Sequence, residues 1–154
     1  MNTMFDLQQY ALQKLKDTYT EHEIKVLCSL SFCKLLHYTN IDIHLKKHEF
    51  LAKSFIDKFV QIVEELKTDK PIQYILGETE FAGIDFQLNS ETLIPRPETE
   101  ELVMWIVESG VQPGASVLDI GTGSGCIIVS LGKLLKGVRL CGVDISPAAV
   151  RQAA

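Results

Sequence analysis

Glycine and proline are confined to the later part of this chain, and their distribution limits the folds open to it. All ten glycines lie at or after Gly77 and all five prolines at or after Pro71, so residues 1–70 contain neither. Both residues are disfavoured inside helices and common in turns. The first region is therefore expected to be a compact helical bundle, and the second to contain strands and tight turns.

Charge divides the chain at the same place. Residues 1–76 carry 10 lysines and 10 acidic residues, whereas residues 77–154 carry 5 basic and 10 acidic residues and hold the whole net charge of −5. An acidic chain is a poor match for sequence-independent binding to nucleic-acid phosphates. The mean hydropathy is only +0.12, and no apolar run has the length of a membrane helix. No apolar leader segment is visible either, and we expect a cytoplasmic protein with no membrane or direct nucleic-acid partner.

Cysteine and histidine spacing gives no sign of a metal site. The four cysteines form no Cys-x-x-Cys pair and lie in apolar stretches, as reduced and buried side chains do. His44 and His48 would share a helix face, but the segment that joins them lacks the glutamate of the zinc-protease motif. We therefore expect no metal.

The apolar residues of the first region recur at helical spacing. A first helix is predicted from Met4 to Leu15, and Thr20 with Glu23 forms a capping box that opens a second helix ending near His37. A short helix or turn is expected over 40–46, and a longer helix over 49–66. The predicted core of this bundle contains Met4, Leu7, Ala11, Leu15, Ile24, Leu27, Leu30, Leu35, Leu51, Phe55, Phe59, Ile62 and Leu66.

The pattern changes from helical spacing to alternation after Gly77. Apolar and polar residues alternate over 84–88, which predicts a strand, and residues 78–81 form its hairpin partner across Ala82 and Gly83. Pro97 suits the first position of a helix that continues to Ser109. The residues expected to face inward on that helix are Leu102, Val103, Ile106 and Val107.

Residues 117–144 have the order strand, glycine loop, helix, strand, acid. Residues 117–120 and 138–143 are apolar runs of strand length, separated by a glycine-rich loop and a predicted helix over 126–136. Asp144 follows the second run, and Ser146 caps a further helix. This order is typical of the opening half of a doubly wound α/β sheet.

The loop between the two predicted strands has the chemistry of a nucleotide-type site. In doubly wound sheets, ligands bind beyond the carboxyl ends of the strands, where the glycine loop and Asp144 are both expected. Glycines let a ligand approach the main chain, and a carboxylate can accept hydrogen bonds from ribose hydroxyls. A dinucleotide fingerprint needs a glycine where Cys126 stands, and no lysine follows to make a phosphate-binding P-loop.

The pattern Gly-x-Gly-x-Gly, with Asp119 two residues before it, resembles the first motif of the class I S-adenosylmethionine-dependent methyltransferases. The resemblance implies S-adenosyl-L-methionine as the cofactor and main-chain contacts to its methionine part from the loop. It further implies that Asp119 points to the amino group and Asp144 to the ribose. The loop residues concerned are Gly121, Thr122, Gly123, Ser124 and Gly125. An alternative stays open, in which Asp119 caps its strand and the glycines are plain turn residues.

A second resemblance covers about half of the chain. Residues 70–77, then Phe81 and Gly83, then the segment 93–100 with its Ile-Pro-Arg-Pro-Glu-Thr-Glu run, resemble the HemK/PrmC family. These enzymes are N(5)-glutamine methyltransferases of peptide chain release factors. The resemblance implies a helical substrate-docking domain over 1–76, a β-hairpin linker over 77–93, and the start of a Rossmann-like class I methyltransferase domain over 94–154. It also implies release factors as partners of a monomer.

Two further features of the family bear on catalysis. Arg96, Pro97 and Thr99 match a segment near the cofactor, although helix capping explains them equally well. The family's Asn-Pro-Pro-Tyr motif, which holds the substrate glutamine, does not occur in this chain. We therefore expect a fragment with no catalytic residue of its own. Two other hypotheses remain: an adenine-N(6) methyltransferase acting on DNA or RNA, and a non-catalytic binding module.

Overall fold

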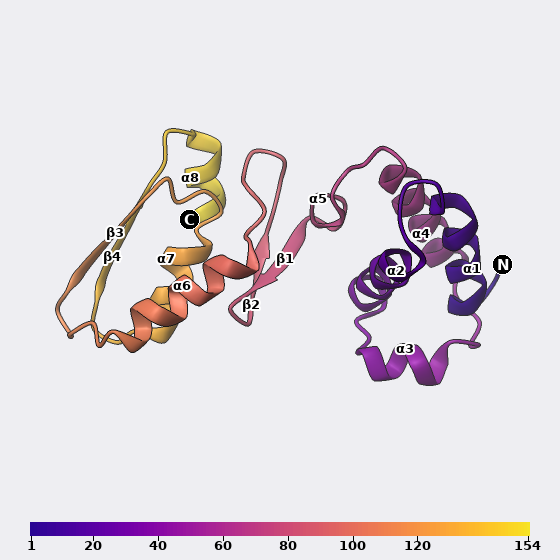
Figure 1. The fold of residues 1–154 in the computed structure, drawn as a ribbon, viewed down its shortest axis with the longest axis horizontal. Coiled ribbons are helices and arrows are strands. Elements are labelled where there is room, and N and C mark those ends of the chain that lie inside the picture. The colour runs from indigo at the N-terminus through magenta and orange to yellow at the C-terminus, as the bar shows by residue number, and fades with distance from the viewer. The chain divides into compact units, whose positions relative to one another are not determined.

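The chain folds into eight helices and four strands in the computed structural model, which describes residues 1–154. Its contacts divide it into two compact units, Met1–Leu76 and Gly77–Ala154 (Figure 1). The first unit is entirely helical, and all four strands belong to the second. None of the helices combines the length and the apolar character that crossing a lipid bilayer would need.

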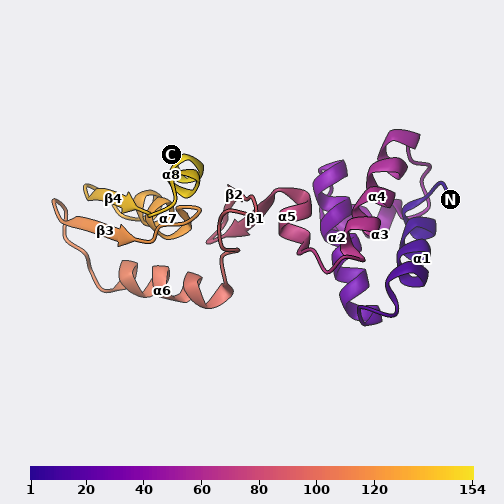
Figure 2. The same ribbon diagram turned by 90° about the horizontal axis from the view of Figure 1, so that it is seen from above.

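The helical unit is built from four helices and a short terminal one (Figure 2). They are α1 (Met4–Leu15), α2 (Glu21–Leu36), α3 (Asn40–Lys46), α4 (Lys53–Leu66) and α5 (Ile72–Leu76). The predicted first, second and short helices are confirmed. Helix α5 was not predicted, because its five residues between Pro71 and Gly77 are too few for a periodic pattern to show.

The core of the helical unit is aromatic at its centre. Phe59 of α4 stacks on Phe32 of α2, with ring centroids 4.9 Å apart, and both side chains are buried. Burial raises the pKa of the neighbouring Cys28 thiol to about 12, so this cysteine stays protonated and packs as a small apolar residue. The predicted core is largely confirmed.

One predicted core residue of α2 was wrong, and the helix geometry explains the error. Leu30 is exposed, whereas the next residue, Ser31, is buried. The Ser31 hydroxyl donates a hydrogen bond to the carbonyl oxygen of Leu27 at 2.8 Å, and this bond satisfies the hydroxyl inside the core. A polar residue therefore takes a core position that the hydrophobic pattern had given to leucine.

The predicted start of α4 at residue 49 was also wrong, because the preceding segment pairs with the N-terminus. Leu51 donates its backbone N–H to the Asn2 carbonyl at 2.8 Å, and Phe5 donates to the Lys47 carbonyl at 3.0 Å. Thr3 and Phe50 form an antiparallel bridge between these bonds. The backbone of this segment is extended there, and the helix begins only at Lys53.

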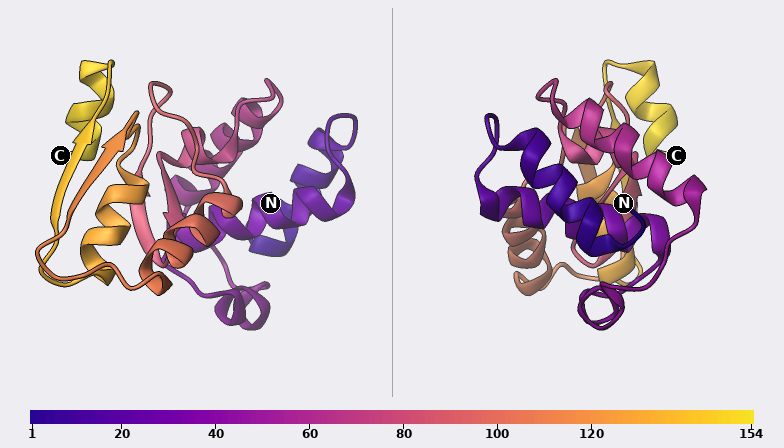
Figure 3. Two further views of the ribbon diagram at one scale, coloured as in Figure 1. Left: turned by 60° about the vertical axis from the view of Figure 1, so that its left-hand side comes forward. Right: turned by 90° about the vertical axis from the view of Figure 1, so that its right-hand side faces the viewer.

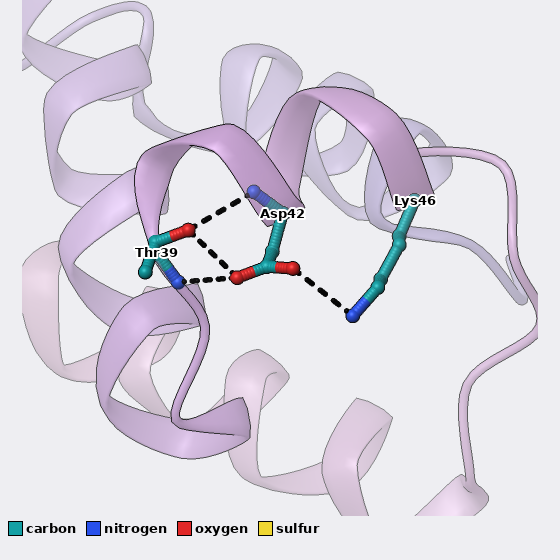
Figure 4. A network of polar contacts seen from close by, with 3 residues as sticks. All are labelled: Thr39, Asp42 and Lys46. Atoms are coloured by element: carbon teal, nitrogen blue, oxygen red, sulfur yellow. Dashed lines mark hydrogen bonds and ion pairs between the residues drawn. The ribbon is translucent and has the colours of Figure 1, made fainter.

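Helix α3 begins with a capping box that an ion pair extends (Figure 4). The Asp42 carboxylate accepts hydrogen bonds from the backbone N–H of Thr39 at 3.0 Å and from its hydroxyl at 2.7 Å. The Lys46 ammonium lies 3.1 Å from the other carboxylate oxygen, one turn further along. These bonds, first those from the Thr39 side chain and backbone and then that from Lys46, lower the pKa of Asp42 to about 2.

We expect α3 to lose its N-terminal cap as pH falls from about 3.8 to about 2. Because the folded pKa lies below the ordinary value, the carboxylate stabilises the fold above pH 3.8, and this stabilisation disappears on protonation. The protection factors of the amide hydrogens of residues 40–46, which compare the exchange rate with that of an unfolded peptide at the same pH, should fall across that window. In Asp42→Asn this acid-induced fall should vanish, and an equal fall in this variant would contradict the assignment.

The second unit begins with an antiparallel hairpin and continues into a parallel strand pair. Its elements are β1 (Glu78–Phe81), β2 (Ile84–Gln87), α6 (Pro97–Glu108), β3 (Ser116–Ile120), α7 (Cys126–Leu134), β4 (Arg139–Val143) and α8 (Pro147–Ala153). In the parallel pair Ser116 lies opposite Arg139 and Ile120 opposite Val143. The hairpin, the helix from Pro97, both later strands and the helix capped by Ser146 were all predicted and are confirmed.

One core joins the hairpin to helices α6 and α7. Phe81 and Phe86 of the hairpin pack edge to face and share this core with Val103, Cys126 and Leu131. Leu102, which was predicted to face inward, is exposed, because the buried side of α6 is centred on Val103 one residue further along. Helix α7 covers one face of the β3–β4 pair, and Leu118 and Ile120 are exposed on the other.

Candidate functional site

The loop that follows β3 requires glycine at alternate positions. Gly121, Gly123 and Gly125 have φ values of 82°, 55° and 78°, a region that side-chain-bearing residues rarely adopt. A Cβ at Gly121 would meet nothing within 4 Å, so the backbone there lies open to a ligand. Beyond the end of β3, a ligand would therefore contact the backbone of the loop and not side chains.

The loop is tied to the end of β4 by main-chain hydrogen bonds. The N–H groups of Gly121 and Thr122 donate to the Val143 carbonyl oxygen at 2.8 and 3.0 Å. Gly125 donates to the Thr122 carbonyl at 2.8 Å, which closes the turn before α7 begins. The loop and the residues after β4 consequently lie at one edge of the sheet.

Asp144 reaches this loop directly. Its Oδ2 accepts the Gly123 N–H at 2.9 Å, and its Oδ1 accepts the Ser146 N–H at 2.9 Å. These two backbone bonds, first from Ser146 and then from Gly123, lower the pKa of the Asp144 carboxyl, so the group is ionised at neutral pH. Each oxygen keeps a lone pair for a further donor, such as a hydroxyl group.

Asp119 supports the loop from the other strand. Its Oδ2 accepts a hydrogen bond from the Thr122 hydroxyl at 2.8 Å, and the Thr122 side chain is buried. Gly142 of β4 makes room for that side chain, because a Cβ there would lie 2.9 Å from the Thr122 hydroxyl oxygen. The structure thus brings together every residue that the sequence singled out in the loop, together with Asp119 and Asp144.

Several contributors to the site were not predicted. Gly142 could have been found from its position, since a glycine inside an apolar strand is typical of a close approach by neighbouring atoms. Ser146 was predicted only as a helix cap, and it also holds Asp144. The role of the Val143 carbonyl could not be predicted from the sequence, because every residue has a main-chain carbonyl acceptor.

The segment before α6 supplies helix-starting groups. Arg96 is the N-cap residue of α6, Pro97 is the first helical residue, and the Thr99 N–H donates to the Arg96 carbonyl at 2.9 Å. Both Arg96 and Glu98 are exposed. Arg96 therefore occupies the N-cap position, although its side chain makes no capping hydrogen bond.

Comparison with known proteins matches the two parts of the chain to two different families. Residues 6–77 match the family described as the PrmC N-terminal domain, and residues 97–154 match the family described as ribosomal protein L11 methyltransferase (PrmA). The second match concerns the part of the chain that contains the glycine loop and Asp144.

Curated relatives extend over most of the chain. Proteins named release factor glutamine methyltransferase are 38% identical in Flavobacterium psychrophilum and 42% in Bacteroides thetaiotaomicron, each over 92% of this chain. One from Nitratidesulfovibrio vulgaris is 37% identical over 84% of it. The chain spans about half the length of these relatives, with 51%, 50% and 43% of each covered. These matches point to the HemK/PrmC family: the first unit matches its N-terminal domain, and most of the chain is similar to proteins named release factor glutamine methyltransferase.

Proposed function

We propose that the second unit is the beginning of a Rossmann-like class I methyltransferase domain that binds S-adenosyl-L-methionine at the glycine loop. The parallel β3–β4 pair joined through α7 supports this, because such a unit is the building block of doubly wound sheets. Ligands of these sheets bind beyond the carboxyl ends of the strands, which is where the loop and Asp144 lie.

The hydrogen bond from the Gly123 N–H to Asp144 Oδ2, 2.9 Å long, carries this proposal. It means that a single small molecule could contact both the open main chain of the loop and the carboxylate after β4. A nucleoside-bearing ligand fits this pairing, because ribose hydroxyls are hydrogen-bond donors and Asp144 is ionised with lone pairs to spare.

The residues of this chain would bind and orient the cofactor. Asp144 would accept the ribose hydroxyls, the loop would contact the methionine part through its main chain, and Asp119 would hold the loop through Thr122 and attract the amino group. The cofactor supplies a methyl group on a positively charged sulfonium. The main task of the protein is therefore to position the substrate nitrogen, which gains the methyl group as the sulfonium becomes a thioether and which releases one proton to solvent.

The substrate we propose is the side-chain amide of the glutamine in the GGQ motif of peptide chain release factors, methylated in the cytoplasm. The support comes from the relatives, whose shared name states this activity. We further propose that the helical unit docks the protein substrate and that the hairpin forms a linker to the methyltransferase domain. The relatives favour neither the adenine-methylating alternative nor a purely binding role.

The activity is tested with the protein expressed from its complete reading frame. We expect tritium from methyl-labelled S-adenosylmethionine to appear in a release factor, and not in the release factor whose GGQ glutamine is replaced by alanine. Labelling of DNA or RNA in place of the release factor would reject the proposed substrate.

Asp144→Asn should weaken binding of S-adenosylmethionine at least about tenfold, or ~1.4 kcal/mol. The amide cannot reproduce both acceptor oxygens that now hold the Gly123 and Ser146 N–H groups, and it removes the negative charge. Isothermal calorimetry measures the affinity. Asp85→Asn, at an exposed position of β2, is the matched control and should bind like the unaltered protein. Equal affinities of all three proteins for S-adenosylmethionine would show that Asp144 does not contact the cofactor.

A further inference from the structure

Asp119 and Gly142 lie opposite each other on the parallel strand pair, one residue before each strand ends. Figure 3, left, shows β3 (orange) and β4 (yellow) side by side, with α7 next to them. Side chains alternate between the two faces along a strand, so Asp119 is on the face that α7 covers and Leu118 and Ile120 are on the other. Because Gly142 has no side chain, the space next to Asp119 is open to another residue.

The side chain of Thr122 fills this space. Thr122 belongs to the glycine loop, and it is only 7% exposed. A Cβ on Gly142 would lie 2.9 Å from the hydroxyl oxygen, 3.1 Å from the Cβ and 3.2 Å from the methyl carbon of Thr122. All three distances are shorter than the separation of about 3.5–4.0 Å at which carbon atoms pack. Thr122 can therefore occupy its position only because residue 142 is glycine.

The packed side chain of Thr122 also holds Asp119. Its hydroxyl donates a hydrogen bond to Oδ2 of Asp119 at 2.8 Å, which leaves Oδ1 as an acceptor for a ligand. Since the Thr122 side chain is confined by Gly142, the direction of this hydrogen bond is confined as well. A carboxylate that is oriented before the ligand arrives loses little side-chain entropy on binding. Thr122 thus prepares Asp119 for a ligand without having to touch that ligand.

The charge of Asp119 has no cationic partner within the chain. Residues 117–132 contain no lysine or arginine. Arg139 is at the opposite end of the strand pair, where its guanidinium donates a hydrogen bond to the Ser116 hydroxyl at 3.0 Å. A positively charged amino group of a ligand would therefore be the only cation at this end of the strands, and it would form a charge-assisted hydrogen bond with Asp119.

We propose that Thr122 is a positioning residue that sets the preference of the site for ligands with an amino group. It holds the Asp119 carboxylate toward the amino group of the methionine part, an inference that rests on the proposed function. If Thr122 only filled the space over Gly142, its replacement would weaken every ligand of the site to the same extent. A role through Asp119 weakens only the ligands that carry the amino group.

The test compares Thr122→Val with Thr122→Ser in the protein expressed from its complete reading frame. Valine keeps the shape of threonine without the hydroxyl, and serine keeps the hydroxyl. Calorimetry measures the Kd for S-adenosylhomocysteine and for its deaminated analogue, in which hydrogen replaces the amino group. Thr122→Val should raise the first Kd about tenfold and change the second less than about twofold. Thr122→Ser should keep the preference for the ligand with the amino group.

Two further comparisons isolate the hydrogen bond. When Asp119 is already replaced in Asp119→Asn, adding Thr122→Val should cause no further loss of preference, because the carboxylate that Thr122 orients is gone. Thr122→Ala against Thr122→Ser repeats the removal of the hydroxyl with smaller side chains, and it replaces the first comparison if Thr122→Val does not fold. Circular dichroism checks the fold of each variant. Asp144→Asn is the matched control and should weaken both ligands equally, because both carry the ribose.

The outcomes separate this inference from the proposed function. If Thr122→Val weakens both ligands equally or weakens neither, Thr122 does not act through Asp119, and the inference is overturned while the cofactor site stands. Loss of the preference in Thr122→Ser also overturns it, because serine still supplies the hydroxyl. Equal affinity of the unaltered protein for the two ligands would show that Asp119 does not bind the amino group. Binding of neither ligand by the unaltered protein overturns the proposed function as well.

Discussion

Gly125→Ala should lower the affinity for S-adenosylmethionine about 100-fold, or ~2.8 kcal/mol, and destabilise the second unit. Gly125 has a φ of 78°, and the left-handed conformation costs a side-chain-bearing residue about 1–2 kcal/mol. The added Cβ would also lie 2.8 Å from the Cβ and 3.2 Å from the Cα of Ala153. Either α8 or the glycine loop must move, and the loop carries the Gly123 N–H that meets Asp144.

Gly114→Ala separates the two causes. Gly114 has a φ of 85°, yet a Cβ there would meet nothing within 4 Å, and it precedes β3 at the end away from the loop. This control should show the conformational cost alone and bind the cofactor normally. Denaturation measures the free energy of unfolding and calorimetry the affinity. If the two variants are equally destabilised and bind equally well, the contact with Ala153 has no role in shaping the site.

Phe59→Ala should destabilise the helical unit by about 3–5 kcal/mol. Phe59 is only 1% exposed and stacks on Phe32, so its removal takes away apolar burial and leaves a cavity between α2 and α4. Most domains have a total stability of about 5–15 kcal/mol, so a change of this size consumes much of it. Urea denaturation followed by far-ultraviolet circular dichroism measures the loss, because this unit contains most of the helix.

Phe50→Ala is the matched substitution at the surface. Phe50 is 85% exposed, and its truncation should change the free energy of unfolding by less than about 0.5 kcal/mol. A loss below about 1 kcal/mol for Phe59→Ala would show that the cavity collapses and that the aromatic stack does not dominate the core.

Helices with both a periodic apolar pattern and a capping residue could be predicted from the sequence. Helix α2 is an example, since Thr20 and Glu23 form the capping box that their spacing indicated. The pattern was wrong at Leu30 and Leu102, because an apolar residue on a helix does not by itself reveal which side is covered. The start of α4 was wrong because pairing with Asn2 and Thr3, distant in sequence, overrides the local pattern.

The site could be predicted further than the core, because its chemistry depends on spacing. A glycine loop after one strand and an acid after the next were expected to meet, and the Gly123–Asp144 hydrogen bond shows that they do. Three-dimensional complementarity could not be predicted. The fit of Thr122 over Gly142 and the contact of Gly125 with Ala153 join residues whose proximity depends on how α7 and α8 pack.

The double hydrogen bond at the Val143 carbonyl has a consequence for how this fold can vary. The Gly121 and Thr122 N–H groups depend on a peptide oxygen and not on the valine side chain. Any residue able to continue the strand can supply the same acceptor. Residue 143 can therefore be replaced by other residues that favour β-strands while the two hydrogen bonds to the loop are kept. Divergent relatives can share this geometry without sharing the valine.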